Sequence, residues 1–320
     1  MGITRARGRG RAALTGVLVV LLAVVGALPA AGSGGPENGR ISFGRFDPAV
    51  GATTLWTADV DGGNQRRLTS DPSFFSDWSP SGTRIAFDHE DSTGVHIATI
   101  RPDGTQRRAL TSAPGVQEAP DWSPDGRWIA YDAYSPTQPV FSTSIWVMKA
   151  DGTGARRVTR GGFDVEPVFS PDGRRIAFGR ITGDSAAGQM EAIYVVDVDG
   201  TDLRQVVPPR PGLEHPDWSP DGRWISFGIG PEYTDAPDNG ALLSVHPDGS
   251  GLHVLLAPTA SLGFFKPTWS PDGGRLLMGC FDNRVGRDRL RTSTADGERV
   301  RVVPLGSEWV NFPAWGARPR

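Results

Sequence analysis

Short apolar runs recur along the chain, each opening on a large side chain and separated from the next by polar, turn-forming residues. Consecutive apolar positions are typical of a strand that is buried on both faces of its sheet. A looser apolar run follows each of them and ends at an Asp-Gly pair, after which comes an often arginine-bearing segment. The runs of the first set are RISF (40–43), RIAF (84–87), WIAY (128–131), RIAF (175–178), WISF (224–227) and RLLM (275–278).

An aromatic residue marks each repeat of this pattern, with intervals of 44 to 51 residues between successive marks. Six repeats fill residues 39–320, and each predicts four short strands, which is the unit of a β-propeller blade. We therefore predict an all-β protein, a six-bladed β-propeller with four-stranded blades. The aromatic marks are Trp78, Trp122, Phe169, Trp218, Trp269 and Trp315, and the Asp-Gly pairs begin at Asp61, Asp103, Asp151, Asp199, Asp248 and Asp296.

The two ends of the repeat region complement each other. Residues 40–43 have the pattern of the second strand of a blade, and residues 313–316 have the pattern of a first strand. A blade shared by both termini would close the ring and remove the exposed edges of an open one. We expect this closure.

The phrase DWSPDGRWI, found at 121–129 and again at 217–225, combines residue types that could form an active site. Its repetition around the ring favours a structural role instead. The aromatic residue is expected to pack between neighbouring blades, while Ser and Asp form hydrogen bonds within a turn shaped by Pro and Gly.

These phrases, together with Asp-Gly turns followed by arginines such as 151–157, resemble the WD-like Pro-Asp repeats of the TolB-like propeller family. The resemblance covers essentially all of residues 39–320 and is more specific for fold than for function. It implies a propeller that binds another protein of the cell envelope, as the TolB propeller binds a peptidoglycan-associated lipoprotein. We expect the propeller alone, without the N-terminal α/β domain of TolB. Similar propellers also precede serine peptidase domains and, more remotely, occur in oligogalacturonate lyases.

Residues 1–32 have the features of a secretory signal peptide. Four arginines precede an apolar stretch at 14–28, and small residues follow it. The stretch is short for a membrane span, which needs about 20 residues; an uncleaved signal-anchor is the alternative. With 33–38 as a short linker, we expect an exported protein, either secreted or held in the periplasm or cell envelope.

Charge and cysteine content narrow the possible partners. Without the four leader arginines, 29 basic residues stand against 36 acidic ones, a net charge of −7, which disfavours nucleic-acid binding. Cys280 is the single cysteine and excludes an internal disulfide bond. We expect a monomer without a cofactor.

No sequence motif for catalysis or metal binding occurs here with the spacing and structural context that its chemistry requires. The phrase GDSAAG at 183–188 is not a G-x-S-x-G nucleophile motif and is expected to be a loop. The five histidines are expected to lie apart, on different blades, without the spacing of metal ligands. Residues 197–202 look like a calcium loop but lack its later glutamate, so we expect a turn. Arginine pairs such as Arg156 and Arg157 are expected to protect outermost strands from edge-to-edge aggregation.

Loops of variable length are expected on one face of the ring. The connections 88–94, 132–143 and 228–240 differ in length, whereas the Asp-Gly turns of the other face are nearly uniform, so the variable face is the predicted binding face. Residues three and four places before each repeating aromatic are expected to surround the channel mouth there. The predicted binding residues are Glu118, Glu166, Glu214, His215, Lys266, Asn311, Phe75, Phe265 and Phe312.

Two interpretations of this mouth stay open. Three successive blades supply glutamates and the other three supply phenylalanines, which predicts a mouth that is half acidic and half aromatic. Either the phenylalanines plug the channel and the glutamates are only solvated, or the mouth binds a segment with a basic residue beside an apolar one.

The patterns favour a non-catalytic propeller that binds an envelope or extracellular protein or peptide. The first alternative is an enzyme that acts on an extracellular sugar or peptide, with a mouth glutamate or His215 as acid or base. The second is a membrane-tethered sensor domain, which would require that the apolar leader stays uncleaved.

Overall fold

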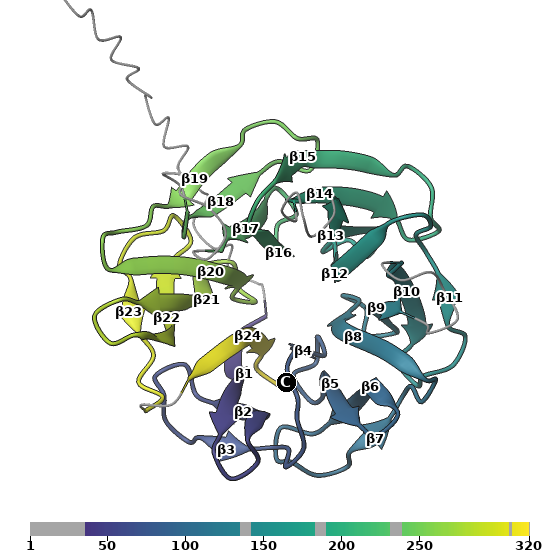
Figure 1. Ribbon diagram of the computed structural model, residues 1–320, viewed down its shortest axis with the longest axis horizontal. Coiled ribbons are helices and arrows are strands. Elements are labelled where there is room, and N and C mark those ends of the chain that lie inside the picture. The colour runs from purple at the N-terminus through teal and green to yellow at the C-terminus, as the bar shows by residue number, and fades with distance from the viewer. Residues whose placement is uncertain (1–35, 135–141, 183–189, 231–238, 307–308, 320) are drawn as a thin grey trace, which may run out of the picture.

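The computed structural model describes residues 36–134, 142–182, 190–230, 239–306 and 309–319. Figure 1 shows β-sheets arranged as six blades around a central channel. The prediction of an all-β, six-bladed propeller with four-stranded blades is confirmed. In the part of the chain that the structure describes, there is no helix long and apolar enough to cross a membrane. The predicted signal peptide and the GDSAAG loop lie outside the described residues.

Each blade runs from the channel to the outer rim in four antiparallel strands. The innermost strands, in the first to sixth blades, are β4 (Ser76–Trp78), β8 (Gly115–Trp122), β12 (Phe163–Phe169), β16 (Leu213–Trp218), β20 (Leu262–Trp269) and β24 (Val310–Ala317). The second strands are β5 (Ile85–Asp91), β9 (Trp128–Tyr134), β13 (Arg175–Thr182), β17 (Ile225–Ile229), β21 (Arg275–Asp282) and β1 (Asn38–Asp47).

The outer half of each blade contains the two remaining strands. The third strands are β6 (Gly94–Ile100), β10 (Ser144–Lys149), β14 (Met190–Asp197), β18 (Leu242–Val245), β22 (Arg287–Thr294) and β2 (Ala52–Ala58). The outermost strands are β7 (Arg108–Ala109), β11 (Arg156–Arg157), β15 (Arg204–Arg210), β19 (His253–Leu256), β23 (Arg301–Val302) and β3 (Arg66–Arg67). A short parallel pairing of Gly94 with Gly115 also links the first blade to the second.

The sixth blade contains both ends of the propeller. Strand β1 pairs with β24, and Ile41 stands opposite Trp315 in the register. Asn38, the first residue of β1, pairs with Ala317, the last of β24. The predicted closure of the ring is therefore confirmed.

The repeating aromatic residues pack between blades. Trp78 of the first blade lies in one buried cluster with Leu55 and Ala314 of the sixth, and Trp218 of the fourth packs with Ile193 of the third. The same relation holds for the other four aromatic residues. Each buries a large apolar surface at a blade boundary, and such interfaces between neighbouring repeats contribute to the stability of the ring.

The Ser-Pro-Asp-Gly turn forms its own hydrogen bonds, as predicted. Ser123 Oγ donates to Asp125 Oδ1 (2.6 Å) and accepts from the backbone N–H of Trp128 (2.9 Å). Gly126 takes the left-handed conformation, with φ of 68°, which glycine adopts without steric cost.

Arginines of the outermost strands link consecutive blades. Arg66 and Arg108 each donate to the aspartate carbonyl of the next blade's Asp-Gly turn, at 3.0 Å, and Arg156 donates to the carbonyl of Val198 at 2.8 Å. These side chains therefore join one blade to the next, in addition to the edge protection that the sequence predicts.

Candidate functional site: the channel mouth

A bulge in the inner strands turns side chains toward the channel axis. In five blades the strand register shifts just before a proline. The residue before each proline has a positive φ of 50° to 55°, although residues in that position usually adopt extended conformations. These residues are Ala119, Glu166, His215, Lys266 and Phe312. The first blade has Ser76 in place of the proline.

Three consecutive residues from each inner strand line the channel, such as His215, Pro216 and Asp217 in the fourth blade. Together they surround a cavity of about 120 Å³. The residues three places before the repeating aromatic reach this cavity. They are Phe75, Ala119, Glu166, His215, Lys266 and Phe312.

Aromatic side chains from different blades meet at the channel axis. The ring of Phe75 stacks on His215 of the opposite blade, with 5.6 Å between centroids, and contacts Phe312 edge-on at 4.7 Å. Lys266 Nζ lies 3.5 Å from the centre of the Phe312 ring, a cation–π contact. This arrangement narrows the channel at the mouth.

Glu166 and His215 form an ion pair beside this aromatic group, with 2.7 Å between Oε1 and Nε2. Burial acts to raise the pKa of Glu166, but the charges of His215 and Lys266 outweigh it, so this pKa lies below its usual value. Burial acts to lower the pKa of His215, and the nearby Glu166 carboxylate outweighs it, so this pKa is raised. Both shifts favour the charged pair.

Further carboxylates lie behind the mouth in three successive blades. Asp88 and Asp132 stand where four other blades have glycine. Each accepts a hydrogen bond from the next blade's bulge: Asp88 from the N–H of Ala119 (3.3 Å) and Asp132 from that of Glu166 (3.0 Å). In the third blade, Gly179 leaves room that the carboxylate of Glu191 occupies.

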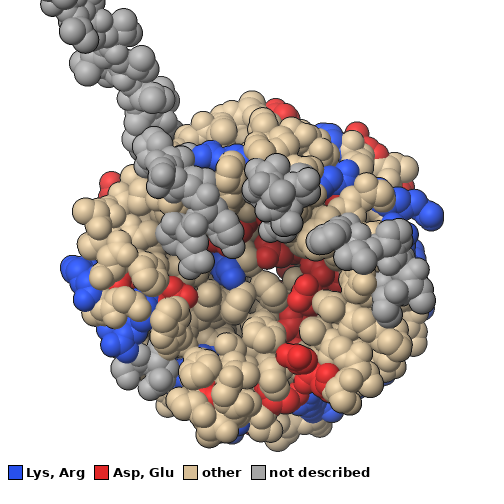
Figure 2. Space-filling model, viewed as in Figure 1, with Lys and Arg blue, Asp and Glu red and all other residues tan. Residues whose placement is uncertain are grey.

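Burial disfavours the charged form of these carboxylates. Burial raises the pKa of Asp88 to about 7, with the Glu118 charge adding to the effect. Burial and the same neighbour raise the pKa of Asp132 well above its usual value, and Asp132 Oδ1 has no hydrogen-bond partner among the described residues. Figure 2 shows acidic side chains along one side of the central hollow. No group of three or more His, Cys, Asp or Glu side chains in the described ranges is arranged to hold a metal ion.

The predicted site residues fall into two sets. Glu166, His215, Lys266, Phe75 and Phe312 line the cavity. The others precede the bulge and do not line it: Glu118, Glu214 and Asn311 are half-buried, and Phe265 is 6% exposed, with its ring against Gly279.

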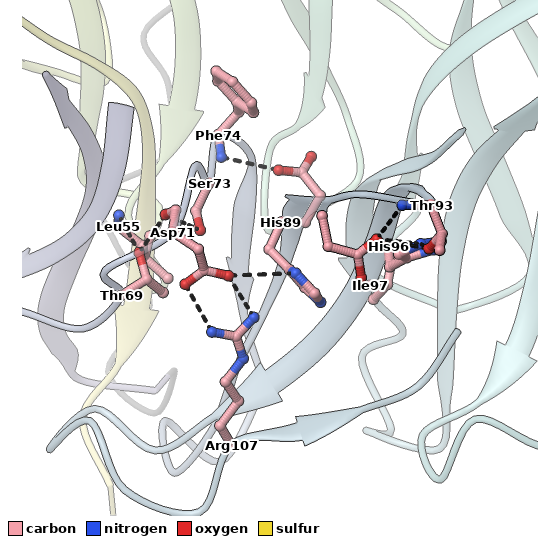
Figure 3. Close-up of polar contacts among 12 residues, drawn as sticks. Leu55, Thr69, Asp71, Ser73, Phe74, His89, Thr93, His96, Ile97 and Arg107 are labelled. Atoms are coloured by element: carbon pink, nitrogen blue, oxygen red, sulfur yellow. Dashed lines mark hydrogen bonds and ion pairs between the residues drawn. The ribbon is translucent and has the colours of Figure 1, made fainter. Parts of the chain in front are cut away.

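The segment that brings Phe74 and Phe75 to the mouth is anchored by a polar cluster (Figure 3). Asp71 accepts two hydrogen bonds from the Arg107 guanidinium, at 2.8 and 2.7 Å. Burial acts to raise the pKa of Asp71, but Arg107 outweighs it and the pKa is lowered. Asp88 Oδ1 accepts from the N–H groups of Phe74 and Phe75, at 2.9 and 3.1 Å.

The expectation that the histidines lie apart on different blades is wrong. His89 stands opposite His96 on β5 and β6, with 6.1 Å between ring centroids, and His246 and His253 both contact Trp224. The two histidines of each pair meet because they lie on or beside adjacent strands of one blade.

Residues 199–201 form the predicted turn, with Asp199 Oδ1 accepting from Thr201 N (2.9 Å).

Two further groups of residues were not expected at this site. Asp77, Asp121 and Asp217 line the deeper channel. Each of them directly precedes a repeating Trp in the sequence, and this position could have identified them. Phe46 and Trp309 on the variable-loop face are 39% and 52% exposed; the N–H of Phe46 donates to the carbonyl of Trp309 at 3.0 Å.

The fold and the channel define the class of protein: a six-bladed β-propeller with side chains of all six inner strands gathered at a narrowed mouth. The family model described as "TolB beta propeller domain" (PD40) matches residues 38–318. The chain belongs to this family, and the predicted resemblance is confirmed.

Individual relatives agree with this assignment. The chain is 29% identical over 130 residues to an uncharacterized protein of Agrobacterium fabrum, covering 40% of this chain and 43% of the relative. It is 35% identical over 129 residues to the Tol-Pal system protein TolB of Anaeromyxobacter dehalogenans, covering 37% and 27%. The matched stretches thus span less than half of these relatives.

Solved structures share the fold. TolB from Acinetobacter baumannii superposes with a TM-score of 0.71 at 24% identity, covering 88% of this chain and 68% of that one. An oligogalacturonate lyase in complex with manganese has a TM-score of 0.55 at 12% identity, with 83% and 74% covered. Solved propellers of this shape therefore include a TolB protein and an oligogalacturonate lyase.

Proposed function

We propose that this chain is an exported, non-catalytic propeller that binds a protein or peptide segment at the variable-loop face. The segment carries a basic residue beside an apolar one. The observation that supports this most directly is that the variable-loop face carries two kinds of side chain: the glutamates Glu118, Glu166 and Glu214, and the exposed aromatic pair of Phe46 and Trp309.

The aromatic pair supplies a contact area that protein interfaces favour. Trp and Phe are enriched in interface cores, and tryptophan is among the residues whose truncation costs most affinity. Trp309 belongs to the same blade as Phe312. An apolar side chain of the partner would pack on this side.

The acidic side supplies attraction for a basic group. Glu118 and Glu214 are half-buried and precede the bulge, and the charge of Glu118 acts on Glu166 and Asp88. Clustered carboxylates accelerate the encounter with a cationic segment and make binding dependent on salt. The envelope partner of the family member TolB supports a protein as the ligand.

Capture of a partner by matched variants tests this proposal. Immobilised 36–320 is offered to envelope and culture-fluid extracts of the host, beside the double variant Glu118→Gln/Glu214→Gln and the single variant Trp309→Ala. Glu166 is kept, because it accepts a hydrogen bond from the N–H of His215. Glu298→Gln, on an exposed turn of the opposite face, is the matched control.

We expect a protein that the parent and the control retain and that both mouth variants bind at least about tenfold more weakly. A captured protein that binds both mouth variants as tightly as the parent would contradict the proposal.

An enzyme acting on an extracellular sugar or peptide is the second candidate. The observation that favours it is the contrast between Glu166, whose pKa is lowered by its charged neighbours, and Glu118, whose pKa is raised by burial and by Glu166. Carboxyl groups with divergent pKa values can serve as acid and base. Turnover of an oligosaccharide or peptide that Glu118→Gln abolishes would establish this alternative.

A third proposal concerns the N-terminal segment, 1–32, which we assign as a cleaved secretory signal. Retention of the segment would make the propeller a membrane-tethered sensor instead. Sequencing the N-terminus of the exported protein distinguishes the two cases.

A further inference from the structure

The outermost strand of the fourth blade, β19, differs from the other five outer strands. At the position where those blades carry Arg66, Arg108, Arg156, Arg204 and Arg301, β19 carries His253. Its neighbours Leu252 and Val254 are 47% and 49% exposed. This outer strand therefore lacks the arginine that the other five share, and an exposed apolar side chain stands on each side of that position.

Strand β19 also keeps an edge that can accept another strand. It spans four residues, while β3, β7, β11 and β23 span two each, and β15 contains Pro208 and Pro209. No described strand pairs with its outer side. Natural proteins blunt such edges with charge, proline or short length. Strand β19 contains no proline and no Asp, Glu, Lys or Arg, and it is longer than four of the other five outer strands.

A cationic hollow lies where the chain turns into β19. Arg175, Arg204, Arg223 and His246 line an open hollow of about 530 Å³ between the third and fourth blades. Asp248, the one acidic residue of this lining among the described residues, already accepts from the N–H and Oγ of Ser250, at 2.9 and 2.6 Å. Arg204 also pairs with Asp202 beside the hollow, with 3.0 Å between Nη1 and Oδ2. The described lining itself carries three arginines against one aspartate.

An aromatic contact connects the hollow to the strand. The Trp224 ring stacks on His246 at 3.9 Å between centroids and meets His253 edge-on at 4.8 Å. The outer strands β15 and β19 follow each other along the rim (Figure 1). Because successive residues of a strand point to opposite faces, the hollow lies on the side of His253, whereas Leu252 and Val254 point to the other side of the same strand edge.

We propose that this strand edge and the hollow together bind an extended acidic segment of a partner protein. The segment adds to the fourth blade as a fifth strand along β19, its apolar side chains pack beside Leu252 and Val254, and its carboxylates enter the hollow of Arg204 and Arg223. Strand addition takes affinity from main-chain hydrogen bonds and specificity from side-chain pockets. Charge complementarity favours an acidic partner. A second copy of this chain is disfavoured, because its cationic hollow would face the cationic hollow of the first copy.

Fluorescence anisotropy with a dye-labelled synthetic peptide that alternates glutamate and valine tests the proposal on the full chain. We expect saturable binding that weakens with salt, and at least about tenfold weaker binding to Arg204→Gln/Arg223→Gln and to Val254→Glu. Val302→Glu is the matched control, because Val302 occupies the corresponding position on β23 and is 40% exposed. Thermal unfolding verifies that each variant is folded.

Several results would overturn the proposal. These are equal binding of a peptide that alternates lysine and valine, unchanged affinity in the two β19-side variants, or a concentration-dependent dimer of the free protein that Val254→Glu abolishes. Hydrogen exchange gives a second readout: the bound peptide should slow exchange in β19. The variant Glu118→Gln/Glu214→Gln should bind this peptide normally, so failure here and failure at the channel mouth are distinguishable.

Discussion

Asp217 of the fourth blade accepts a hydrogen bond from the backbone N–H of Trp269 in the fifth, with 2.8 Å between Oδ2 and N. Asp77 makes the same contact with Trp122 (2.8 Å) and Asp121 with Phe169 (2.7 Å). The aspartate before a repeating aromatic thus connects its blade to the next while facing the channel. Burial of the Asp217 carboxylate disfavours its charged form, whereas the hydrogen bond from the N–H of Trp269 favours that form.

The first prediction concerns the pH dependence of Asp217. Burial raises its pKa to about 7, whereas an unfolded aspartate titrates near 4. Between these values the folded protein binds a proton that the unfolded chain has released, so the contribution of Asp217 to stability falls as pH rises from about 4 to 7. Asp217→Asn keeps an acceptor without the charge.

We expect Asp217→Asn to be more stable than the parent at pH 8 by about 1–2 kcal/mol, less than the full shift implies because the carboxylate borders the channel cavity. The advantage should shrink as pH falls and vanish only below about pH 4, where the carboxyl is protonated in both states. Denaturant unfolding at several pH values measures it, with Asp61→Asn on an exposed turn as control. A gain of equal size at both pH values would contradict this assignment.

The second prediction separates two tryptophans of the same terminal segment. Trp315 is 6% exposed and packs with Leu277 and Leu290 of the fifth blade, whereas Trp309 is 52% exposed. Trp315→Ala should lower the free energy of unfolding by about 3–5 kcal/mol, and Trp309→Ala by no more than about 0.5 kcal/mol. Similar losses in both variants, measured by chemical denaturation, would be inconsistent with this packing.

The third prediction concerns ring closure by β24. Deleting 311–320 removes most of the strand that pairs with β1 and exposes an edge and the boundary packed by Trp315. We expect cooperative thermal unfolding to be lost in calorimetry. A deletion of 319–320 alone, beyond the end of β24, should leave the transition intact. A 311–320 deletion that melts like the parent would rule out this closure.

The fourth prediction compares two glycines. Gly94 has a φ of 144°, and a side chain there would collide with the carbonyl of Gly115 in the second blade. Gly51 has a φ of 72° and open space around it. Gly94→Ala should therefore cost about 2–4 kcal/mol and Gly51→Ala about 1 kcal/mol. Equal losses in the two variants would mean that the contact between β6 and β8 contributes no constraint.

The sequence by itself determined the blades and their closure. A period near 47 residues requires repeated units, and apolar runs separated by Asp-Gly and Ser-Pro-Asp-Gly turns leave four strands in each. The complementary ends, 40–43 and 313–316, determine which blade both termini share. Local turn chemistry and burial suffice for these inferences, because every repeat forms the same strands and packs against its neighbours in the same way.

Only the tertiary structure decided which side chains reach the channel. Glu118 and Glu166 stand four and three places before their repeating aromatic, and the sequence predicts both at the mouth; the bulge before each proline turns only the later position, which Glu166 occupies, toward the axis. Phe75 contacts His215 of the opposite blade. The repeat pattern of the sequence does not indicate how close side chains from opposite blades lie to each other. The physical reason is that a strand pattern specifies which face is buried, whereas bulges and neighbouring blades set the final direction of each side chain.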